Sequence, residues 1–583
     1  MTRRSSEPPD GRDPTAADPS IPAAEPPAEP DSAAPPPSAP RRVTARKTTA
    51  RKTTAKKAPA RRTAAKSTTA RKTTAKKAPA RRTAAKSTTA RKTTAKKAPT
   101  RKAGVRKTAR AKPVEIGSTH RRHPYRTLEE RIARGLQWRE VAPLEEQDGF
   151  DPSASRPSAL GMLRAQDDTR VADLVPIRYG RMSASPFSFY RGSAAVMAYD
   201  LAQEARTPGR TQICGDAHLS NFGFFASPER DLVFDVNDFD ETLPGPFEWD
   251  VKRLTASVVL AARSRDFSKK EAKAAAVEAA EGYRSVIHQL AASRNMDVWY
   301  TKVDADLIRQ GIVRLAAAQG DKKFVKRAEQ RLDGIFSKAR GKTSLRAADK
   351  LTKIVDGKRQ FRENPPLLTR AIQAEAGPAE IEDLFVQYKG TLTSDRRRLI
   401  ERYRFNDLAF KVVGVGSVGT RAIVLLLEGR DLQDPLILQA KEATASVLEP
   451  YLGASHQQNH GERVVHGQRY MQAFSDIFLG WVRTGPGRDF YLRQLHDMKG
   501  SVDVETLRPE GLNAYARICG ITLARAHARG GDVVAIASYL GETDKFAKAV
   551  ARFGLAYADQ AEKDYAELQA AIADGSVPVE AGI

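Results

Sequence analysis

The sequence predicts a mixed α and β (α+β) folded region behind a long disordered tail, and three observations predict it. Residues 1–40 are rich in Pro, Ala and acidic residues, so they cannot bury enough apolar surface to offset their ordering entropy. Residues 41–113 are basic and repetitive. From about residue 120 to 575, apolar residues return with helical and strand periodicity, over a length that fits two lobes or two to three domains.

The positive charge of the chain is concentrated in one segment. Between Arg41 and Lys112 there are 28 Lys and Arg residues and no Asp or Glu. The formal net charge is +27, so subtracting these 28 charges leaves −1 for all other residues. The high isoelectric point therefore describes this segment, and it does not predict a basic nucleic-acid-binding fold for the remainder.

The basic segment consists of sequence repeats. The unit at residues 50–69 recurs unchanged at 70–89, and a partial third copy begins at Ala90. A proline in each unit prevents one long helix, and without aromatic residues the available chemistry is Lys and Arg against phosphate. The composition resembles the tails of linker histones and of some bacterial nucleoid proteins. We expect residues 41–112 to bind nucleic acid non-specifically and with strong salt dependence; the alternatives are a solvated spacer or an anchor to acidic protein or membrane surfaces.

Cysteine content and hydropathy indicate a cytoplasmic protein. Cys214 and Cys519 have no partner at metal-ligand spacing and make no disulfide framework. No apolar core of a signal peptide follows the first residues, and the longest apolar runs, such as residues 422–427, are far too short to span a bilayer. We therefore expect a cytoplasmic protein that the tail brings to the nucleoid.

Periodicity predicts the main elements of the folded region in order. Helical patterns occur at residues 127–141, 247–263, 269–292, 378–402, 511–529 and 543–571. Strand-like runs occur at residues 232–236, 422–428, 436–440, 477–483 and 489–495. Because helices dominate and the strands cluster in two places, a mixed α and β enzyme is favoured over a repeat array.

The first strand cluster carries a dense set of carboxylate and amide residues. The stretch Gly-Asp216-Ala-His-Leu-Ser-Asn221 is followed, after a turn, by Asp235-Val-Asn-Asp238-Phe-Asp240. Phosphoryl transfer needs a carboxylate to orient the attacking hydroxyl, and carboxylate and amide oxygens to hold Mg²⁺ on the phosphates. This spacing supplies that set; the alternative is that these are turn residues of a β-hairpin.

These residues resemble the catalytic loop and metal site of aminoglycoside and choline kinase-like phosphotransferases. The segment Gly-Pro-Phe-Glu-Trp-Asp250-Val-Lys-Arg-Leu is similar to the one that follows the metal-binding Asp in that family. The resemblance implies that Asp216 is the catalytic base, Asn221 a metal ligand and Asp238 the principal metal ligand. It also implies that Asp250 is structural.

Other residues of this segment have less defined roles. Asp235 and Asp240 are alternative metal ligands, and His218 is expected to brace the loop. The kinase-like family usually has His before Gly-Asp, whereas this chain has Cys214, which bears on how the loop packs.

A glycine-rich loop, Gly414-Val-Gly416-Ser417-Val-Gly419, opens the second strand cluster. Such a loop alone fits a dinucleotide site or a plain hairpin, but the dinucleotide version leads directly into a helix. Here a strand, a turn and a second strand ending in Lys441 follow. Kinases use this order of elements to cover ATP and pair a lysine with its phosphates. The predicted ATP-binding residues are therefore Gly414, Gly416, Ser417, Gly419 and Lys441.

Lys441 has two interpretations. It contacts the phosphates, with Glu449 or Glu462 as its carboxylate partner, or it is a solvated lysine at a strand end. If both motifs hold one ATP, Lys441 and Asp238 should face one cleft within roughly ten ångströms of each other.

The two motifs occur in the reverse of their order in an ordinary kinase. A circularly permuted, two-lobed kinase-like fold explains this order, and the alternative is that one motif is accidental. The predicted parts are a catalytic-loop region at about 185–400, a nucleotide-covering lobe at about 403–500 and C-terminal helices at 511–571. Residues 518–528 resemble the helix before the catalytic loop in small-molecule kinases, where His527 is assigned no catalytic role.

The stretch from 120 to 575 also resembles the uncharacterised bacterial family called domain of unknown function 2252. The segments that carry this resemblance are Ser185-Pro-Phe-Ser-Phe-Tyr-Arg191-Gly, the two motifs above, Arg469-x-Met-Gln and Tyr491-x-Arg-Gln-Leu. This family name implies no reaction.

Together these patterns predict an ATP- and Mg²⁺-dependent phosphotransferase with an unknown acceptor, tethered to nucleic acid by its tail. The alternatives are a nucleoid-associated binding protein with an inactive kinase-like domain, and transfer of AMP instead of phosphate.

Overall fold

The structure, a computed structural model, describes residues 125–318, 322–370, 378–485, 487–495 and 497–582. The chain divides into two units, Met1–Glu115 and Ile116–Ile583, and all described residues belong to the second. The predictions for residues 1–113, a disordered tail that binds nucleic acid, lie outside the described residues.

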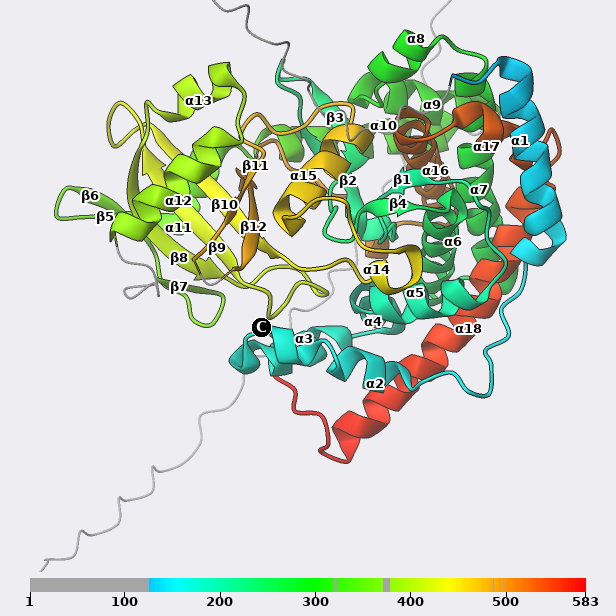
Figure 1. The fold of residues 1–583 in the computed structure, drawn as a ribbon, viewed down its shortest axis with the longest axis horizontal. Coiled ribbons are helices and arrows are strands. Elements are labelled where there is room, and N and C mark those ends of the chain that lie inside the picture. The colour runs from blue at the N-terminus through cyan, green and yellow to red at the C-terminus, as the bar shows by residue number, and fades with distance from the viewer. Residues whose placement is uncertain (1–124, 319–321, 371–377, 486, 496, 583) are drawn as a thin grey trace, which may run out of the picture. The chain divides into compact units, whose positions relative to one another are not determined.

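One part of the second unit is helical and is built around α6 (Phe247–Arg263), whose residues Phe247–Ala262 are all buried. In Figure 1 the helices α7, α16 and α18 lie beside it. Small residues allow α7 and α16 to approach closely: a Cβ on Gly520 would lie 1.9 Å from the carbonyl oxygen of Ala279. The helices of this part are α1 (Leu128–Val141), α2 (Ala159–Arg164), α3 (Val175–Met182), α4 (Pro186–Gly192), α5 (Ala194–Gln203), α6, α7 (Lys269–Ala291), α8 (Asn295–Tyr300), α9 (Ala305–Ala318), α10 (Lys322–Arg340), α16 (Pro509–Gly530), α17 (Val533–Leu540) and α18 (Lys545–Ala573).

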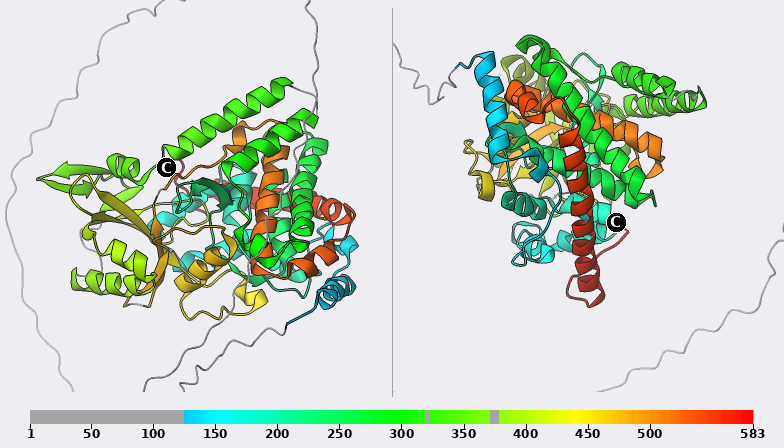
Figure 2. Two further views of the ribbon diagram at one scale, coloured as in Figure 1. Left: turned by 90° about the horizontal axis from the view of Figure 1, so that it is seen from above. Right: turned by 90° about the vertical axis from the view of Figure 1, so that its right-hand side faces the viewer.

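The other part is an antiparallel sheet with the strand order β11-β12-β10-β9-β8-β7. Alternate residues of its strands face two separate cores: Leu425 and Leu427 pack with Tyr388 of α12, whereas Val424 and Leu426 pack with Ala348 of α11. Figure 2 shows helices on both faces of this sheet. The elements of this part are α11 (Ser344–Leu351), β5 (Thr352–Val355), β6 (Lys358–Phe361), β7 (Leu368–Arg370), α12 (Pro378–Gly390), α13 (Ser394–Ile400), β8 (Arg404–Lys411), β9 (Ala422–Glu428), β10 (Pro435–Ala443), α14 (Glu449–Leu452), α15 (His460–Met471), β11 (Gly480–Arg483) and β12 (Asp489–Gln494).

Two small antiparallel pairs carry the first motif. β1 (Thr211–Ile213) pairs with β4 (Leu243–Gly245), and β2 (Phe222–Ala226) pairs with β3 (Leu232–Val236). Asp216 lies on the connection from β1 to β2, and Asp238 and Asp240 lie on the connection from β3 to β4, whereas Asp235 lies within β3. The pairing of the strands therefore brings the two connections together.

The structure confirms the mixed α+β class and most of the expected elements. The expected helix at 378–402 is instead two helices, α12 and α13, because the first ends at Gly390 and Thr393 begins the second. The strand expected at 477–483 begins only at Gly480, since the Asp476 carboxylate accepts a hydrogen bond from the Phe478 amide in a turn. Sequence periodicity missed β8 and α15. None of the described helices is long and apolar enough to cross a membrane.

Candidate active site

The loop between β1 and β2 is fixed by Asp250 of α6. Its carboxylate accepts hydrogen bonds from the backbone amides of Cys214 and Gly215 at 2.8 and 2.9 Å, and it lies 3.1 Å from Nε2 of His527. His527 Nδ1 in turn lies 2.9 Å from the hydroxyl of Tyr283. Asp250 thus holds the loop through two backbone amides, in agreement with the structural role that the resemblance implies. His527 acts within this buried chain of hydrogen bonds, and Cys214 contacts Asp250 through its backbone amide and its thiol.

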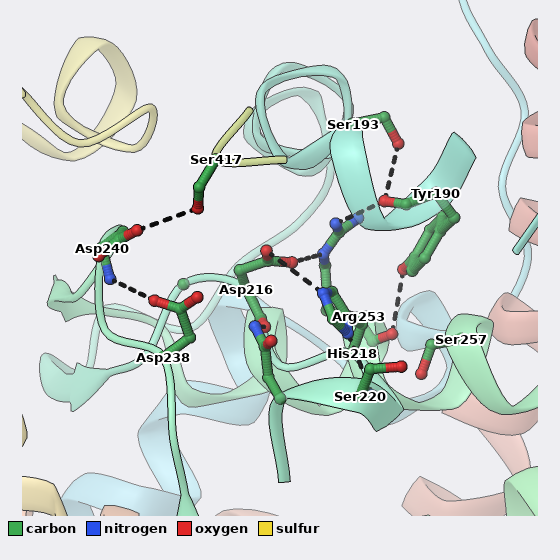
Figure 3. Close-up of polar contacts among 12 residues, drawn as sticks. Tyr190, Ser193, Asp216, His218, Ser220, Asp238, Asp240, Arg253, Ser257 and Ser417 are labelled. Carbon is green, nitrogen blue, oxygen red and sulfur yellow. Dashed lines mark hydrogen bonds and ion pairs between the residues drawn. The ribbon is translucent and has the colours of Figure 1, made fainter. Parts of the chain in front are cut away.

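Asp216 points from this loop toward Arg253, one helical turn after Asp250 on α6 (Figure 3). The Arg253 Nε donates to Asp216 Oδ1 at 2.7 Å, and its Nη2 donates to the carbonyl oxygen of Tyr190 at 2.8 Å. Burial raises the pKa of Asp216, and the charge of Arg253 opposes this shift. The result is an oriented carboxylate with one oxygen, Oδ2, not hydrogen-bonded to Arg253.

His218 and Asn221 complete the loop. The amide of Ser220 donates to His218 Nδ1 at 3.2 Å, which leaves the proton of the neutral ring on Nε2, 3.7 Å from Asp216 Oδ2. Burial and two nearby arginines lower the pKa of His218 well below its usual value, so the ring is neutral and braces the loop. Asn221 Nδ2 donates to the carbonyl oxygen of Asp216 at 2.7 Å. Because the nitrogen is used in this way, the oxygen of Asn221 is the atom that a metal would meet.

Asp238 and Asp240 lie on the connection from β3 to β4 and face Lys441 of β10. Lys441 Nζ donates to Asp240 Oδ2 at 2.6 Å and lies 3.7 Å from Asp238 Oδ1. Burial alone would favour the neutral amine, but the two carboxylates raise the pKa of Lys441 above its usual value. Burial and the charge of Asp240 raise the pKa of Asp238, whereas Lys441 lowers that of Asp240 despite its burial. The expected distance between Lys441 and Asp238 is thus met.

The glycine-rich loop joins β8 to β9 above these carboxylates. Ser417 Oγ donates to Asp240 Oδ2 at 3.4 Å, the contact drawn in Figure 3. Gly414 and Gly419 adopt φ angles of 70° and 90°, which favour glycine. The carbonyl oxygen of Gly414 accepts from Arg181, and that of Gly419 accepts from the Val171 amide at 2.8 Å. These contacts hold the loop against the segment before α3 and against α3 itself.

The two motifs line one cavity of about 390 Å³. Asp216, Asp238, Gly416 and Ser417 are among its lining residues, together with Asp240. The other predicted residues lie outside the lining: Lys441 pairs with Asp238 and Asp240, Asn221 lies in the loop that carries Asp216, and Gly414 and Gly419 form the ends of the glycine-rich loop.

Two expectations are wrong: that Asp235 is an alternative metal ligand, and that Glu449 or Glu462 pairs with Lys441. Asp235 is fully buried, pairs with Arg525 and accepts from the Ala473 amide at 3.0 Å, so it is a structural residue and no metal ligand. Glu449 and Glu462 do not pair with Lys441: Glu449 accepts from the Ser446 amide, and Glu462 lies 3.8 Å from His466. Lys441 pairs instead with Asp238 and Asp240 of the first motif.

Sequence reasoning also missed three residues of the site. Arg253 orients Asp216, and its position one turn after Asp250 in a predicted helix is a signal that could have shown it. Tyr491 donates to Asp240 Oδ1 at 2.7 Å, within a segment that carried a family resemblance. Arg463 of α15 donates to the carbonyl oxygens of Asp240 and Thr242, both at 2.8 Å, and sequence gave no signal for this contact.

The donor set fits Mg²⁺ only together with a phosphate ligand. Over the described residues, no group of three or more His, Cys, Asp or Glu side chains is arranged to hold a metal ion. Mg²⁺ typically binds through one or two carboxylates together with substrate phosphates and water, instead of in an all-protein cage. Asp238 and the Asn221 oxygen meet that requirement.

Two family models match the chain. One, described as an uncharacterized protein conserved in bacteria (DUF2252), matches residues 170–571. The other, described as a histone H1-like nucleoprotein, matches residues 23–129. The chain matches no curated protein and no solved structure. The first match includes both parts that carry the cavity, and the second includes the basic repeats.

Proposed function

The chain belongs to the DUF2252 family, and from its site we propose an ATP- and Mg²⁺-dependent phosphotransferase of kinase-like, circularly permuted fold. The observation that carries this proposal is the meeting of the two motifs. Lys441 and Asp240 are 201 positions apart in the chain, yet they form a 2.6 Å ion pair beside the cavity that Asp216 and Ser417 line. If one of the two motifs were accidental, its residues would not be expected to line the same cavity as those of the other.

The order of elements in the sheet supports a kinase-like nucleotide lobe. A glycine-rich loop joins β8 to β9, and the adjacent strand β10 carries the lysine. Along the chain, helix α15 follows β10 and precedes the β11–β12 pair. This is the set of parts that kinases use to cover ATP phosphates and pair them with a lysine. The carboxylate that faces the lysine here comes from the proposed metal loop.

Contacts at the end of α16 support the permutation. A Cβ on Gly531, directly after α16, would lie 2.1 Å from Thr211 Oγ1 at the start of β1. The helix that resembles the one before a kinase catalytic loop therefore ends beside the strand that leads into Asp216. Joining these positions would restore the ordinary order, which is what a circular permutation predicts.

Each residue then has a chemical role. The acceptor oxygen bonds to the terminal phosphorus of ATP while the bond from that phosphorus to the bridging oxygen breaks, and ADP leaves with the electron pair. Asp216 accepts the proton of the acceptor hydroxyl, Arg253 keeps Asp216 oriented, and Lys441 pairs with phosphate. Mg²⁺, held by Asp238 and Asn221, would neutralise phosphate charge.

The experiment that tests this function is a screen with ATP labelled at the terminal phosphate, in which products are identified by mass. Transfer of 80 Da groups supports phosphotransfer, whereas addition of AMP shows that the nucleotide binds in another orientation. Absence of both products, together with absence of MgATP binding, would leave a scaffolding role for the domain.

We further propose that the tail tethers this domain to nucleic acid. The match of residues 23–129 to a histone H1-like nucleoprotein supports this proposal, as does the density of cationic residues from Arg41 to Lys112.

A further inference from the structure

The segment Ser185–Gly192 is one of those that carry the family resemblance. The proposed function gives no role to its residue Arg191. The segment forms α4, in which Phe187, Phe189 and Tyr190 are buried in the cores. Tyr190 holds Arg253 twice: its carbonyl oxygen accepts from Nη2 at 2.8 Å, and its hydroxyl donates to the Arg253 carbonyl oxygen at 3.0 Å. The helix thereby positions Asp216 through Arg253.

Arg191 lines the cavity with a positive charge that has no matching partner. Among the described residues no hydrogen bond or ion pair reaches its side chain, and its buried Nε is unpartnered. Burial lowers the pKa of Arg191, and the charge of Asp216 partly opposes this effect. An unpaired guanidinium in a largely buried position destabilises the fold, so its presence beside the cavity points to a ligand.

Arg170 also lines this cavity, and its guanidinium forms no ion pair with a carboxylate of a described residue. One of its nitrogens donates to the Val418 carbonyl oxygen, but its buried Nε is unpartnered. Burial and the charge of Arg178 lower the pKa of Arg170 to about 10. Arg170 therefore also lacks a carboxylate within its hydrogen-bonding reach.

The carboxylates of the cavity are already balanced by other groups. Arg253 binds Asp216, Lys441 pairs with Asp238 and Asp240, and Arg421 lies 3.2 Å from Glu442. Burial raises the pKa of the remaining one, Glu241, to about 7. Each of these three cations is thus already engaged with a carboxylate, whereas no ion pair joins Arg170 or Arg191 to a carboxylate of the cavity.

We propose that Arg170 and Arg191 form an anion subsite for a phosphate group on the acceptor molecule, which makes the acceptor a phosphorylated hydroxyl compound. This inference rests on the proposed phosphotransferase function. Two guanidinium groups match the charge of a phosphate dianion better than that of a carboxylate, and guanidinium binds phosphate with paired hydrogen bonds. Arg191 lines the cavity together with the proposed base Asp216, whose charge acts on it.

The test is calorimetric titration of the full chain with inorganic phosphate in EDTA, without nucleotide, where the tail contributes equally to all variants. Arg191→Gln and Arg170→Gln should each weaken phosphate binding about tenfold, since each removes charge-assisted hydrogen bonds. The exposed control Arg430→Gln should bind phosphate as the wild type does. The melting temperature of Arg191→Gln should not fall below that of the wild type, because the substitution removes an unpaired, largely buried charge and breaks no hydrogen bond with a described residue.

Two results would overturn the subsite. These are unchanged phosphate binding in Arg191→Gln, and binding of acetate as tightly as phosphate. A parallel titration with MgATP separates the subsite from the proposed function. Arg191→Gln should keep MgATP affinity, and its loss would assign Arg191 to the nucleotide instead. A wild type that binds phosphate but not MgATP would remove the phosphotransferase proposal and leave the subsite.

Discussion

At the scale of single residues, the site depends on how each buried carboxylate is paired. Asp216 is held by Arg253, whereas Asp238 and Asp240 share Lys441. Removing one member of a buried pair leaves the other charge uncompensated, which costs about 3–5 kcal/mol. Substitutions that keep shape and hydrogen bonding therefore separate a catalytic role from a structural role better than alanine does.

Asp216→Asn should abolish most turnover and spare nucleotide affinity. The amide keeps an acceptor for Arg253 but cannot take the proton of the acceptor hydroxyl, so turnover should fall by about 10²- to 10⁴-fold. The measurement is product formation from labelled ATP alongside calorimetric MgATP binding, with the exposed Glu140→Gln as control. Wild-type turnover in Asp216→Asn would remove the role of base.

Glu241→Gln should change how stability depends on pH. Burial raises the pKa of folded Glu241 to about 7 from a usual value of 4.5, so the folded state binds more protons than the unfolded state between these values. This group therefore makes the free energy of unfolding fall as the pH rises from 4.5 to 7. Denaturant unfolding at several pH values should show a smaller fall in Glu241→Gln than in the wild type or in Glu140→Gln. Parallel curves for all three proteins would show that the pKa of Glu241 is not raised.

At the scale of elements, α6 is the support of the catalytic loop. Asp250 in its first turn binds the amides of Cys214 and Gly215 and contacts His527 of α16, while Arg253 one turn later binds Asp216. The loop is thus tied to two helices of the core.

Asp250→Ala should destabilise the protein by about 3–5 kcal/mol, because two buried amides and His527 lose their partner. Arg294→Ala is the matched control, since it removes an exposed ion pair with Asp297 and should cost no more than about 1 kcal/mol. Both values come from denaturant unfolding. Equal small losses in the two variants would show that Asp250 does not carry the loop.

The sequence allowed prediction of six helical segments and five strands, fewer than half of the described helices and strands, and of few of the partners. Long periodic segments such as α6 and short apolar runs such as β9 were located because their side-chain pattern follows from burial on one face or on both faces. The strand β8 was missed because nearly all of its residues are exposed or half-buried and follow no clear alternation. Partners across the fold, such as Arg463 with the carbonyl oxygen of Asp240, depend on tertiary packing that no local pattern records.

At the scale of the whole molecule, charge divides between two functions. The basic residues are concentrated between Arg41 and Lys112, whereas the remaining residues sum to −1 when these 28 charges are subtracted from the formal +27. The proposed nucleic-acid affinity therefore belongs to the tail and the proposed chemistry to the second unit. Each function can be tested in the absence of the other.

Deletion of residues 1–113 should abolish non-specific DNA binding at moderate salt and leave the melting temperature nearly unchanged. The full chain should lose DNA affinity steeply with added salt, because binding releases counterions from phosphates. Fluorescence anisotropy with a labelled duplex measures both effects, and circular dichroism melting of the two chains is the control for folding. Tight DNA binding by the shortened chain would contradict this division.

Calorimetric titration with MgATP tests the central claim most directly, because that claim has Lys441 and Asp238 act on the phosphates of one nucleotide. The wild type should bind MgATP, and Lys441→Met and Asp238→Asn should each weaken binding by about tenfold or more, since each removes a charge that faces the phosphates or their metal. Arg430→Gln should bind as the wild type does. Failure of the wild type to bind MgATP, or undiminished binding in both site variants, would contradict a nucleotide site formed by the two motifs.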